Sequence, residues 1–171
     1  MKEHISTSIP EFSIRFASDN DTGLVLSFIK ELAAYEKLEH EVEATEENLA
    51  KYLFGDNPKA EVIFGEYQNE PVGFALFFHN FSTFLGKPGI YLEDLFVKPD
   101  QRGNGYGKVM LTYLAYTAEK RNCGRLEWSV LDWNEPAIGF YEKLGAVPMD
   151  EWTVYRVTGL SLKNLANDFR K

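Results

Sequence analysis

Hydrophobic and polar positions change period several times along the chain, which predicts that strands and helices alternate. FSIRFA at 12–17 alternates apolar and polar residues, as a half-buried strand does. Behind it, apolar residues recur at helical spacing up to about Leu38, and Asp19 or Asp21 stands where a helix cap is expected. The apolar face of this predicted helix consists of Leu24, Val25, Phe28, Leu32 and Tyr35.

The next part of the chain predicts a short helix and then a hairpin. Thr45 is placed to cap the helix, and the GDNP sequence at 55–58 ends it. EVIFGEY at 61–67 and VGFALFF at 72–78 have the composition of strands, and QNEP between them is a turn sequence. We therefore expect these two strands to be antiparallel neighbours.

The remaining elements show either the alternation typical of strands or the spacing typical of helices. In chain order they are a loop at 81–84, a strand at 90–97, a helix from the glycine-rich stretch to about Asn122, a strand at 125–131, a helix from Asn134 or Glu135 to Leu144, a strand at 152–159 and a short final helix. The sequence thus predicts one mixed α/β domain over residues 1–171.

Composition and charge limit the partners and the location that we expect for the protein. The 171 residues are 44% hydrophobic and carry a net charge of −8, which disfavours nucleic acid and anionic membranes as partners. The negative charge is compatible with a cationic substrate, and also with an acidic surface that has no specific partner. Cys123 is the one cysteine, so no internal disulfide forms. The chain opens on no signal-like segment, and its longest strongly apolar run, at 74–78, is too short to span a bilayer. We expect a soluble, cytoplasmic protein.

The glycine-rich stretch QRGNGYGKV at 101–109 is the first candidate for chemistry. Its spacing fits neither the dinucleotide fingerprint nor the Walker A loop. Glycines at a helix start nevertheless leave backbone N–H groups approachable, and the helix dipole favours an anion there. Arg102 beside them adds a second attraction for phosphate. Helix capping and tight turning are the alternative explanation.

The sequence RGNGYG resembles the R/Q-x-x-G-x-G/A signature of the GCN5-related N-acetyltransferases (GNAT). The preceding YLEDLFVKPDQRG and the later NEPAIGFYEKLGA resemble the same superfamily. Within it, the chain is similar to the diamine acetyltransferase group, which includes the spermidine/spermine and thialysine enzymes. That narrower similarity covers most of residues 12–166 and is carried by IKELAAYEKLEHEV, FGDNP, STFLGK, YLEDLFV and VLDWNEPAIGFYEKLGA.

This resemblance implies a GNAT fold, which is a central mixed, mainly antiparallel, twisted sheet flanked by helices, with splayed strands that form the acetyl-CoA cleft. It implies acetyl-CoA as the co-substrate, no metal and a homodimer. Pantetheine would extend the strand edge at Leu95, Phe96 and Val97, and Asn134 and Lys143 would also contact the cofactor. The residues implied to hold the pyrophosphate are Arg102, Gly103, Asn104, Gly105, Tyr106, Gly107 and Lys108.

Acetyl transfer to an amine requires that the amine lose a proton. A lysine-like amine has a pKa of about 10.4, so only about one molecule in 2,500 is neutral near pH 7. Strand alternation in YLEDLFV predicts Tyr91, Glu93 and Leu95 on one face and Leu92 and Asp94 on the other. The resemblance implies that Glu93 activates the amine, although the residue types alone fit a structural ion pair equally. Asp94 is interpreted as structural.

Tyr141 is the candidate general acid. An aromatic helix residue is more often part of a core, but the resemblance implies a tyrosine near the CoA sulfur that protonates it. The three histidines, His4, His40 and His79, have no spacing that indicates a metal site.

The resemblance implies substrate contacts from Tyr35 and Glu36, and from Ser82 and Thr83. Polyamine acetyltransferases carry an aspartate and a tryptophan where this chain has Ser82 and Phe84, so the charge that favours a polycation is missing. We therefore expect acetylation of a small diamine or lysine-like amine, of the thialysine type. The alternatives are a polyamine acetyltransferase, a protein or peptide acetyltransferase, and a non-catalytic acyl-CoA-binding module.

Overall fold

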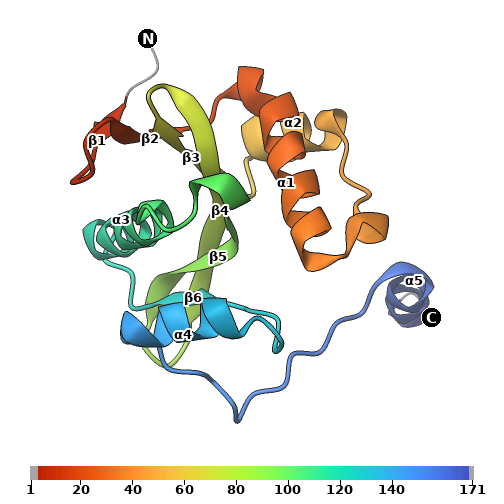
Figure 1. Cartoon of the computed structure of the whole chain (residues 1–171). Coiled ribbons are helices and arrows are strands. Elements are labelled where there is room, and N and C mark those ends of the chain that lie inside the picture. The colour runs from red at the N-terminus through yellow and green to blue at the C-terminus, as the bar shows by residue number, and fades with distance from the viewer. Residues whose placement is uncertain (1–3, 170–171) are drawn as a thin grey trace. The chain divides into compact units, whose positions relative to one another are not determined.

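The alternating segments of the chain pair into one six-stranded sheet. The computed structural model describes residues 4–169, and the chain divides into two compact units, Met1–Ser129 and Val130–Lys171. All six strands belong to the first unit, in which α1 and α2 cover one side of the sheet and α3 the other (Figure 1). The prediction of a single domain stays a prediction.

Most predicted elements are present, with small shifts of their ends. The strands are β1 (Ile5–Ser6), β2 (Phe12–Phe16), β3 (Glu61–Tyr67), β4 (Glu70–Ser82), β5 (Lys87–Val97) and β6 (Leu126–Trp128). The helices are α1 (Thr22–Glu36), α2 (Glu46–Phe54), α3 (Tyr106–Lys120), α4 (Glu135–Lys143) and α5 (Gly159–Asp168), with 3-10 turns η1 (Asp19–Asp21), η2 (Glu39–Glu41) and η3 (Pro99–Gln101). None of the helices described is long and apolar enough to cross a membrane.

Strand order in the sheet follows chain order from β1 to β6. Each pair is antiparallel except β5 and β6, which are parallel. Parallel neighbours need a long crossover, and α3 supplies it. The predicted mixed, mainly antiparallel sheet flanked by helices is therefore confirmed.

Both faces of the sheet are buried by aromatic and aliphatic side chains. On one face Phe28 of α1 packs on Phe64 and Phe74, with ring centroids 5.8 and 5.3 Å apart. On the other face Met110 of α3 is fully buried. Gly65 allows that close approach, because a Cβ at this position would lie 2.9 Å from the Met110 Sδ atom.

Two predicted strands are shorter or missing, and two are longer, namely β4 and β5. β4 continues through Ser82, so the predicted loop at 81–84 shrinks to a turn at 83–86. β6 has three residues where 125–131 was expected, and 152–159 forms no strand. Alternating polarity shows that a segment is compatible with a strand, but a ladder also needs a partner. No described strand pairs with 152–159.

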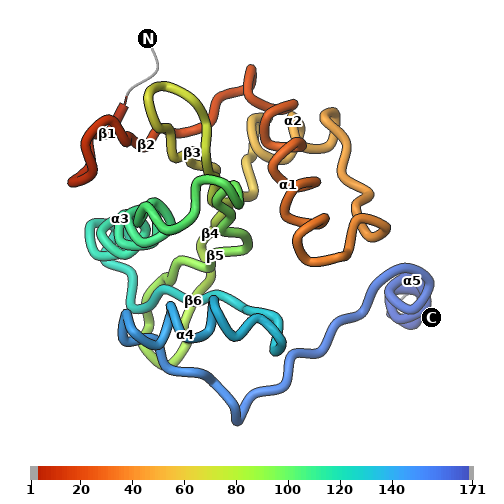
Figure 2. The backbone as a smooth tube through the Cα atoms, viewed as in Figure 1, coloured from red at the N-terminus to blue at the C-terminus, as the bar shows by residue number. Residues whose placement is uncertain are grey.

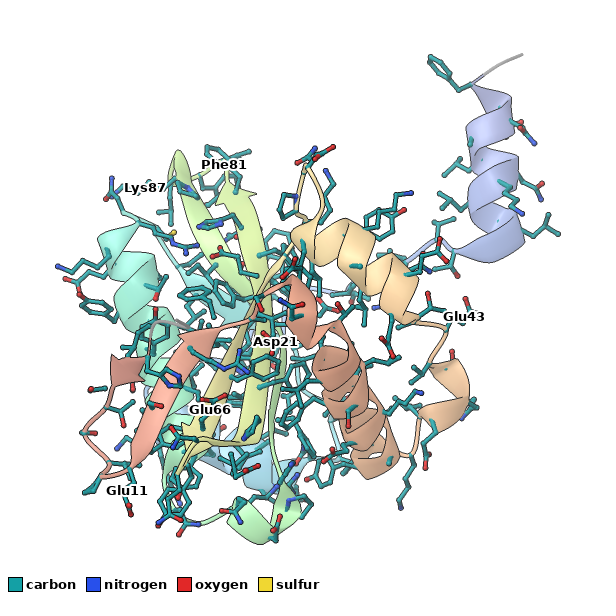
Figure 3. All side chains as sticks on the ribbon, turned by 90° about the horizontal axis from the view of Figure 1, so that it is seen from above. Glu11, Asp21, Glu43, Glu66, Phe81 and Lys87 are labelled. Atoms are coloured by element: carbon teal, nitrogen blue, oxygen red, sulfur yellow. The ribbon has the colours of Figure 1, made fainter. Side chains whose placement is uncertain are left out.

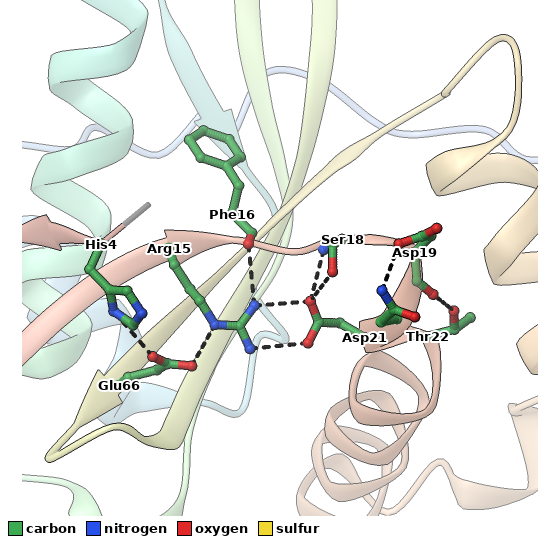
Figure 4. Close-up of polar contacts among 9 residues, drawn as sticks. His4, Arg15, Phe16, Ser18, Asp19, Asp21, Thr22 and Glu66 are labelled. Atoms are coloured by element: carbon green, nitrogen blue, oxygen red, sulfur yellow. Dashed lines mark hydrogen bonds and ion pairs between the residues drawn. The ribbon is translucent and has the colours of Figure 1, made fainter. Parts of the chain in front are cut away.

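A buried ion network joins the sheet to the start of α1 (Figure 4). The Arg15 Nε atom donates to Glu66 Oε1 at 2.6 Å, and its two terminal nitrogens donate to the carboxylate of Asp21 at 3.0 and 3.1 Å. Asp21 was expected to cap the helix with its side chain, but its Oδ2 atom instead accepts from the backbone and hydroxyl of Ser18, both at 2.8 Å. All three charged residues are buried.

Arg15→Met tests how strongly this network holds the fold. We expect it to lower the free energy of unfolding by about 3–5 kcal/mol at pH 7, because two buried carboxylates lose their cation. Urea denaturation followed by circular dichroism measures the change. The same substitution in a Glu66→Gln background is the control, and there it should cost less. A loss below about 1 kcal/mol in the single variant would contradict the assignment.

Candidate active site

The glycine loop between β5 and α3 has a conformation that explains two of its three glycines (Figure 2). Gly103 and Gly105 have φ angles of +83° and +84°, in the left-handed region that other residues rarely adopt. Gly107 lies in the first turn of α3, and a Cβ there would meet only Val97 Cγ2, at an ordinary 3.7 Å. The fold therefore does not require glycine at 107.

Backbone amides at the start of α3 face outward from the helix end. The first α-helical hydrogen bond runs from the amide of Val109 to the carbonyl of Gly105, at 3.0 Å. The N–H groups of Tyr106, Gly107 and Lys108 therefore have no acceptor within the helix. Together with the partial positive charge of the helix N-terminus, they form a site suited to a phosphate or pyrophosphate.

Side chains of the loop mainly hold it in place. Tyr106 is buried and stacks on Phe12 with ring centroids 4.2 Å apart, so it can offer a ligand only its backbone. Asn104 Nδ2 donates to the carbonyl of Gln101 at 3.0 Å and stabilises the turn. Lys108 is exposed and is the loop residue whose charged side chain is free to follow a phosphate.

Arg102 connects the glycine loop to α1. Its Nε atom donates to the carbonyl of Val97 at 3.0 Å, and its guanidinium lies 4.2 Å from the ring centroid of Tyr35 and 5.5 Å from that of Phe96. A residue expected at a phosphate and a residue expected at the substrate are thus in direct contact. Stacking on an aromatic ring orients the guanidinium and leaves its polar edge available.

The second half of β5 has one open edge. β6 pairs with β5 only from Ile90 to Leu92, whereas β4 pairs with β5 as far as Val97. Backbone groups of Leu95 and Val97 point to the far edge and have no strand partner among the described residues, although the carbonyl of Val97 accepts from Arg102. The backbone groups of Phe96 point to β4 instead, where its carbonyl oxygen lies beside Gly73, and its side chain is buried in the core. Such an edge accepts an extended, amide-containing chain.

A β-bulge at Glu93 changes the expected alternation in β5. Asp94 is opposite Leu76 and Leu92 is opposite Phe77, so Glu93 is the extra residue without a partner. Leu76 and Phe77 are consecutive and point to opposite faces, and Leu92 and Asp94 therefore do so too. The predicted common face for Leu92 and Asp94 is wrong, because periodicity gives no sign of an inserted residue.

The bulge brings Glu93 and Asp94 into the lining of one pocket of about 410 Å³. Helix α1, η2 and the connection after η2 supply the other walls, and Figure 3 shows Glu43 on that connection. The five carboxylates of the lining are Glu36, Glu41, Glu43, Glu93 and Asp94. No lysine, arginine or histidine is among the described residues that line it, so the pocket attracts cations.

Asp94 is the most perturbed acid of the pocket. Burial raises the pKa of Asp94 to about 7, and the negative charges of Glu93 and Glu36 act in the same direction. Burial also raises the pKa of Glu36. Asp94 was interpreted as structural from the sequence, and knowledge of the bulge would have been needed to place it in the pocket. Between residues 4 and 169, no group of three or more His, Cys, Asp or Glu side chains is arranged for a metal ion.

Ser82 and Thr83 lie outside this pocket, at the β4–β5 turn. Ser82 is buried, and its Oγ atom accepts from the backbone N–H of Leu85 at 3.2 Å, which stabilises the turn. Thr83 is exposed, and 94% of Phe84 is accessible to solvent. Phe81 marks this end of the hairpin in Figure 3. The structure therefore brings Glu36 and Glu93 together, and not Ser82 and Thr83 with them.

The second unit carries the other predicted residues on one helix. Asn134 is buried and caps α4, with its Oδ1 atom accepting from the N–H of Ala137 at 3.4 Å. Tyr141 lies on the same helix, half-buried, with its ring centroid 5.3 Å from that of Phe140. Lys143 is exposed in the last turn. The helix predicted over this stretch is confirmed.

Comparison with known proteins identifies the fold family. The sequence profile of the acetyltransferase (GNAT) family matches residues 26–146, which include α3 and α4. The chain belongs to the GNAT family. Its phosphate-suited loop, open β5 edge and acidic pocket are therefore features of an enzyme with acyltransferase activity.

Relatives of this GNAT protein act on amines. A thialysine N-epsilon-acetyltransferase of Bos taurus is 37% identical over 164 residues, covering 90% of this chain and 96% of the relative. An L-ornithine N5-acetyltransferase of Arabidopsis thaliana is 33% identical, covering 88% and 86%. Among solved structures, an integron cassette protein of V. cholerae matches with a TM-score of 0.76 at 31% identity, over 91% of this chain and 98% of that one.

The pKa of Asp94 predicts a pH-dependent stability. Unfolded aspartate titrates near pH 4 and folded Asp94 near 7, so its contribution destabilises the fold increasingly as pH rises between these values. We expect Asp94→Asn to raise the free energy of unfolding by up to about 4 kcal/mol at pH 8, and by less at pH 5.5. Urea denaturation at both pH values measures this, with the exposed Asp100→Asn as control. Equal changes at the two pH values would contradict the burial of Asp94.

Proposed function

We propose that this GNAT protein transfers the acetyl group of acetyl-CoA to the primary amine of a small diamine or lysine-like molecule, of which thialysine is the type. The observation that carries the proposal is the pocket lined by five carboxylates and by no basic side chain among its described residues. The negative potential of these carboxylates strengthens the binding of a molecule with a second cationic group, whereas it does not strengthen the binding of a neutral or anionic amine. The thialysine and ornithine acetyltransferases among the relatives support this substrate class.

The cofactor contacts of the proposal use the loop and the open strand edge. Amides of residues 103–108 and the side chains of Arg102 and Lys108 would bind the pyrophosphate, and the edge at 95–97 would bind pantetheine. Asn134 and Lys143 are proposed as further cofactor contacts. Acetyl-CoA supplies an activated thioester carbonyl to the reaction.

Glu93 and Tyr141 have separate proposed roles. Glu93 contacts the substrate ammonium in the pocket and promotes loss of its proton, because only the neutral amine is a nucleophile. Tyr141 supplies the proton that the CoA sulfur needs as it leaves. A thiol has a pKa near 8.5 and a phenol near 10, so this transfer assists departure of a thiolate that is already a fair leaving group.

The polyamine alternative is supported by the same acidic pocket, since a polycation would also gain from it. The missing charge at Ser82 opposes it. Tyr35 and Glu36 remain proposed substrate contacts, and Ser82 and Thr83 remain proposed ligands for a substrate carboxylate. The homodimer and the cytoplasmic location are predictions as before.

Release of CoA from acetyl-CoA tests the function. We expect turnover to be fastest with thialysine, compared with lysine, ornithine, putrescine, spermidine and spermine. Glu93→Gln and Tyr141→Phe should each lower kcat by about 10²-fold or more, because the first removes the carboxylate that contacts the ammonium and promotes loss of its proton, and the second removes the proton donor to the sulfur. Lys108→Ala is the comparison, and should raise the KM for acetyl-CoA more than it lowers kcat.

Preference for spermidine would instead support the polyamine function and overturn the argument from Ser82. Absence of turnover with every amine, while acetyl-CoA still binds, would leave a protein amine acetyltransferase or a binding module.

Gly107→Ala tests the cofactor site without disturbing the fold. A Cβ at 107 has room against Val97, so we expect unchanged or slightly higher stability, since alanine favours a helix by about 1 kcal/mol. Acetyl-CoA affinity, measured by calorimetry, should fall about tenfold or more because the methyl group blocks close approach to the amide. Gly103→Ala is the contrast, and should lose about 1–2 kcal/mol of stability through its positive φ. Unchanged affinity in Gly107→Ala would place the diphosphate elsewhere.

A further inference from the structure

The two adjacent carboxylates of β5 occupy different depths of the same pocket. A regular strand would send Glu93 and Asp94 to opposite faces of the sheet, and the bulge cancels that separation. Glu93 is exposed, whereas Asp94 is half-buried opposite Leu76. A substrate entering from solvent therefore meets Glu93 before it reaches Asp94.

We propose that Asp94 is the catalytic proton acceptor of the acetyl transfer, and that Glu93 receives and orients the ammonium at the mouth of the pocket. This inference rests on the proposed function and deepens it, because it assigns the proton to a residue that sequence reasoning interpreted as structural.

The charges around Asp94 favour its holding a proton. Burial raises its pKa, Glu93 of β5 and Glu36 of α1 raise it further, and Glu41 of η2 and Glu43 of the following connection line the same pocket. No cation lines it among the described residues. An arriving ammonium stabilises the ionised form of Asp94, so Asp94 is a carboxylate when the substrate binds and is able to accept the proton that the ammonium loses.

The proton affinity of Asp94 also favours the acceptor role. An ordinary carboxylate titrates near 4 and an amine near 10.4, so the carboxylate is a poor acceptor for the amine's proton. Asp94, with a pKa of about 7, binds a proton roughly 10³-fold more tightly than an ordinary aspartate. A general base works best when its pKa lies near the operating pH, and Asp94 meets that condition.

The proposed acetyl transfer conserves protons and electron pairs. One N–H bond of the ammonium breaks, its proton joins an Asp94 oxygen, and the nitrogen keeps the electron pair that attacks the thioester carbonyl. The C–S bond breaks, and Tyr141 protonates the sulfur. A second proton from nitrogen restores the tyrosine, and Asp94 releases the first proton to solvent. The net products are the amide, CoA and one proton.

The pH dependence of kcat/KM with the best amine tests the assignment, alongside carboxyl-carbon NMR titration of the substrate-free protein. In wild type we expect kcat/KM to decrease on the acidic side of pH 7 (the acidic limb), and the NMR titration of Asp94 to have its midpoint near the same pH. Glu93→Gln should move the midpoint lower, because it removes a neighbouring negative charge. In Asp94→Asn, kcat/KM should be at least 100-fold lower at pH 7 and should no longer show the decrease centred near that pH. Its logarithm should instead rise with unit slope towards pH 10, as the free amine forms.

Two further variants separate a chemical role from a structural one. Asp94→Glu should regain part of the activity, and Glu41→Gln should keep an acidic limb. A loss below threefold in Asp94→Asn, a limb that survives in it, or an Asp94 midpoint near 4 would overturn the acceptor role while the acetyltransferase function stands. Wild type that turns over none of the amines would instead overturn the proposed function, and the acceptor role with it.

Discussion

The position of α1 on the sheet depends on one buried guanidinium. Arg15 of β2 holds Glu66 of β3 and Asp21 at the start of α1, so a neighbouring strand and the helix start share a single cation. The helix then runs for fifteen residues, about 22 Å, to the end that carries Tyr35 and Glu36. Because a rigid helix transmits a tilt along its length, this contact at its start also sets the geometry of the acidic pocket near its end.

The pocket itself opposes the stability of the fold. Five carboxylates line it without a lining cation among the described residues, and burial of Asp94 adds a desolvation cost. A strand without the bulge would keep Glu93 and Asp94 apart and avoid much of this repulsion. Strain concentrated at one place in an otherwise well-packed sheet is typical of a functional site. Aromatic packing of Phe28 on Phe64 and Phe74 stabilises the same face.

Periodicity predicted α1, α2, α3 and the central strands well, because their apolar faces bury in the core. It failed where structure depends on pairing: residues 152–159 have the pattern of a strand but no ladder, and the bulge at Glu93 leaves no trace in YLEDLFV. The glycine loop was found from sequence, since positive φ at Gly103 and Gly105 demands that residue. Asp94 was missed for the same reason as the bulge. Burial arises from the tertiary fold, which composition does not encode locally.

Stacking of Arg102 on Tyr35 has an evolutionary consequence. The two side chains sit 4.2 Å apart, one on the loop suited to phosphate and the other on the helix that borders the acidic pocket. A substitution at 35 that removed the aromatic ring would release the guanidinium of Arg102 from its place on that loop. Positions 35 and 102 are therefore expected to vary together among homologues.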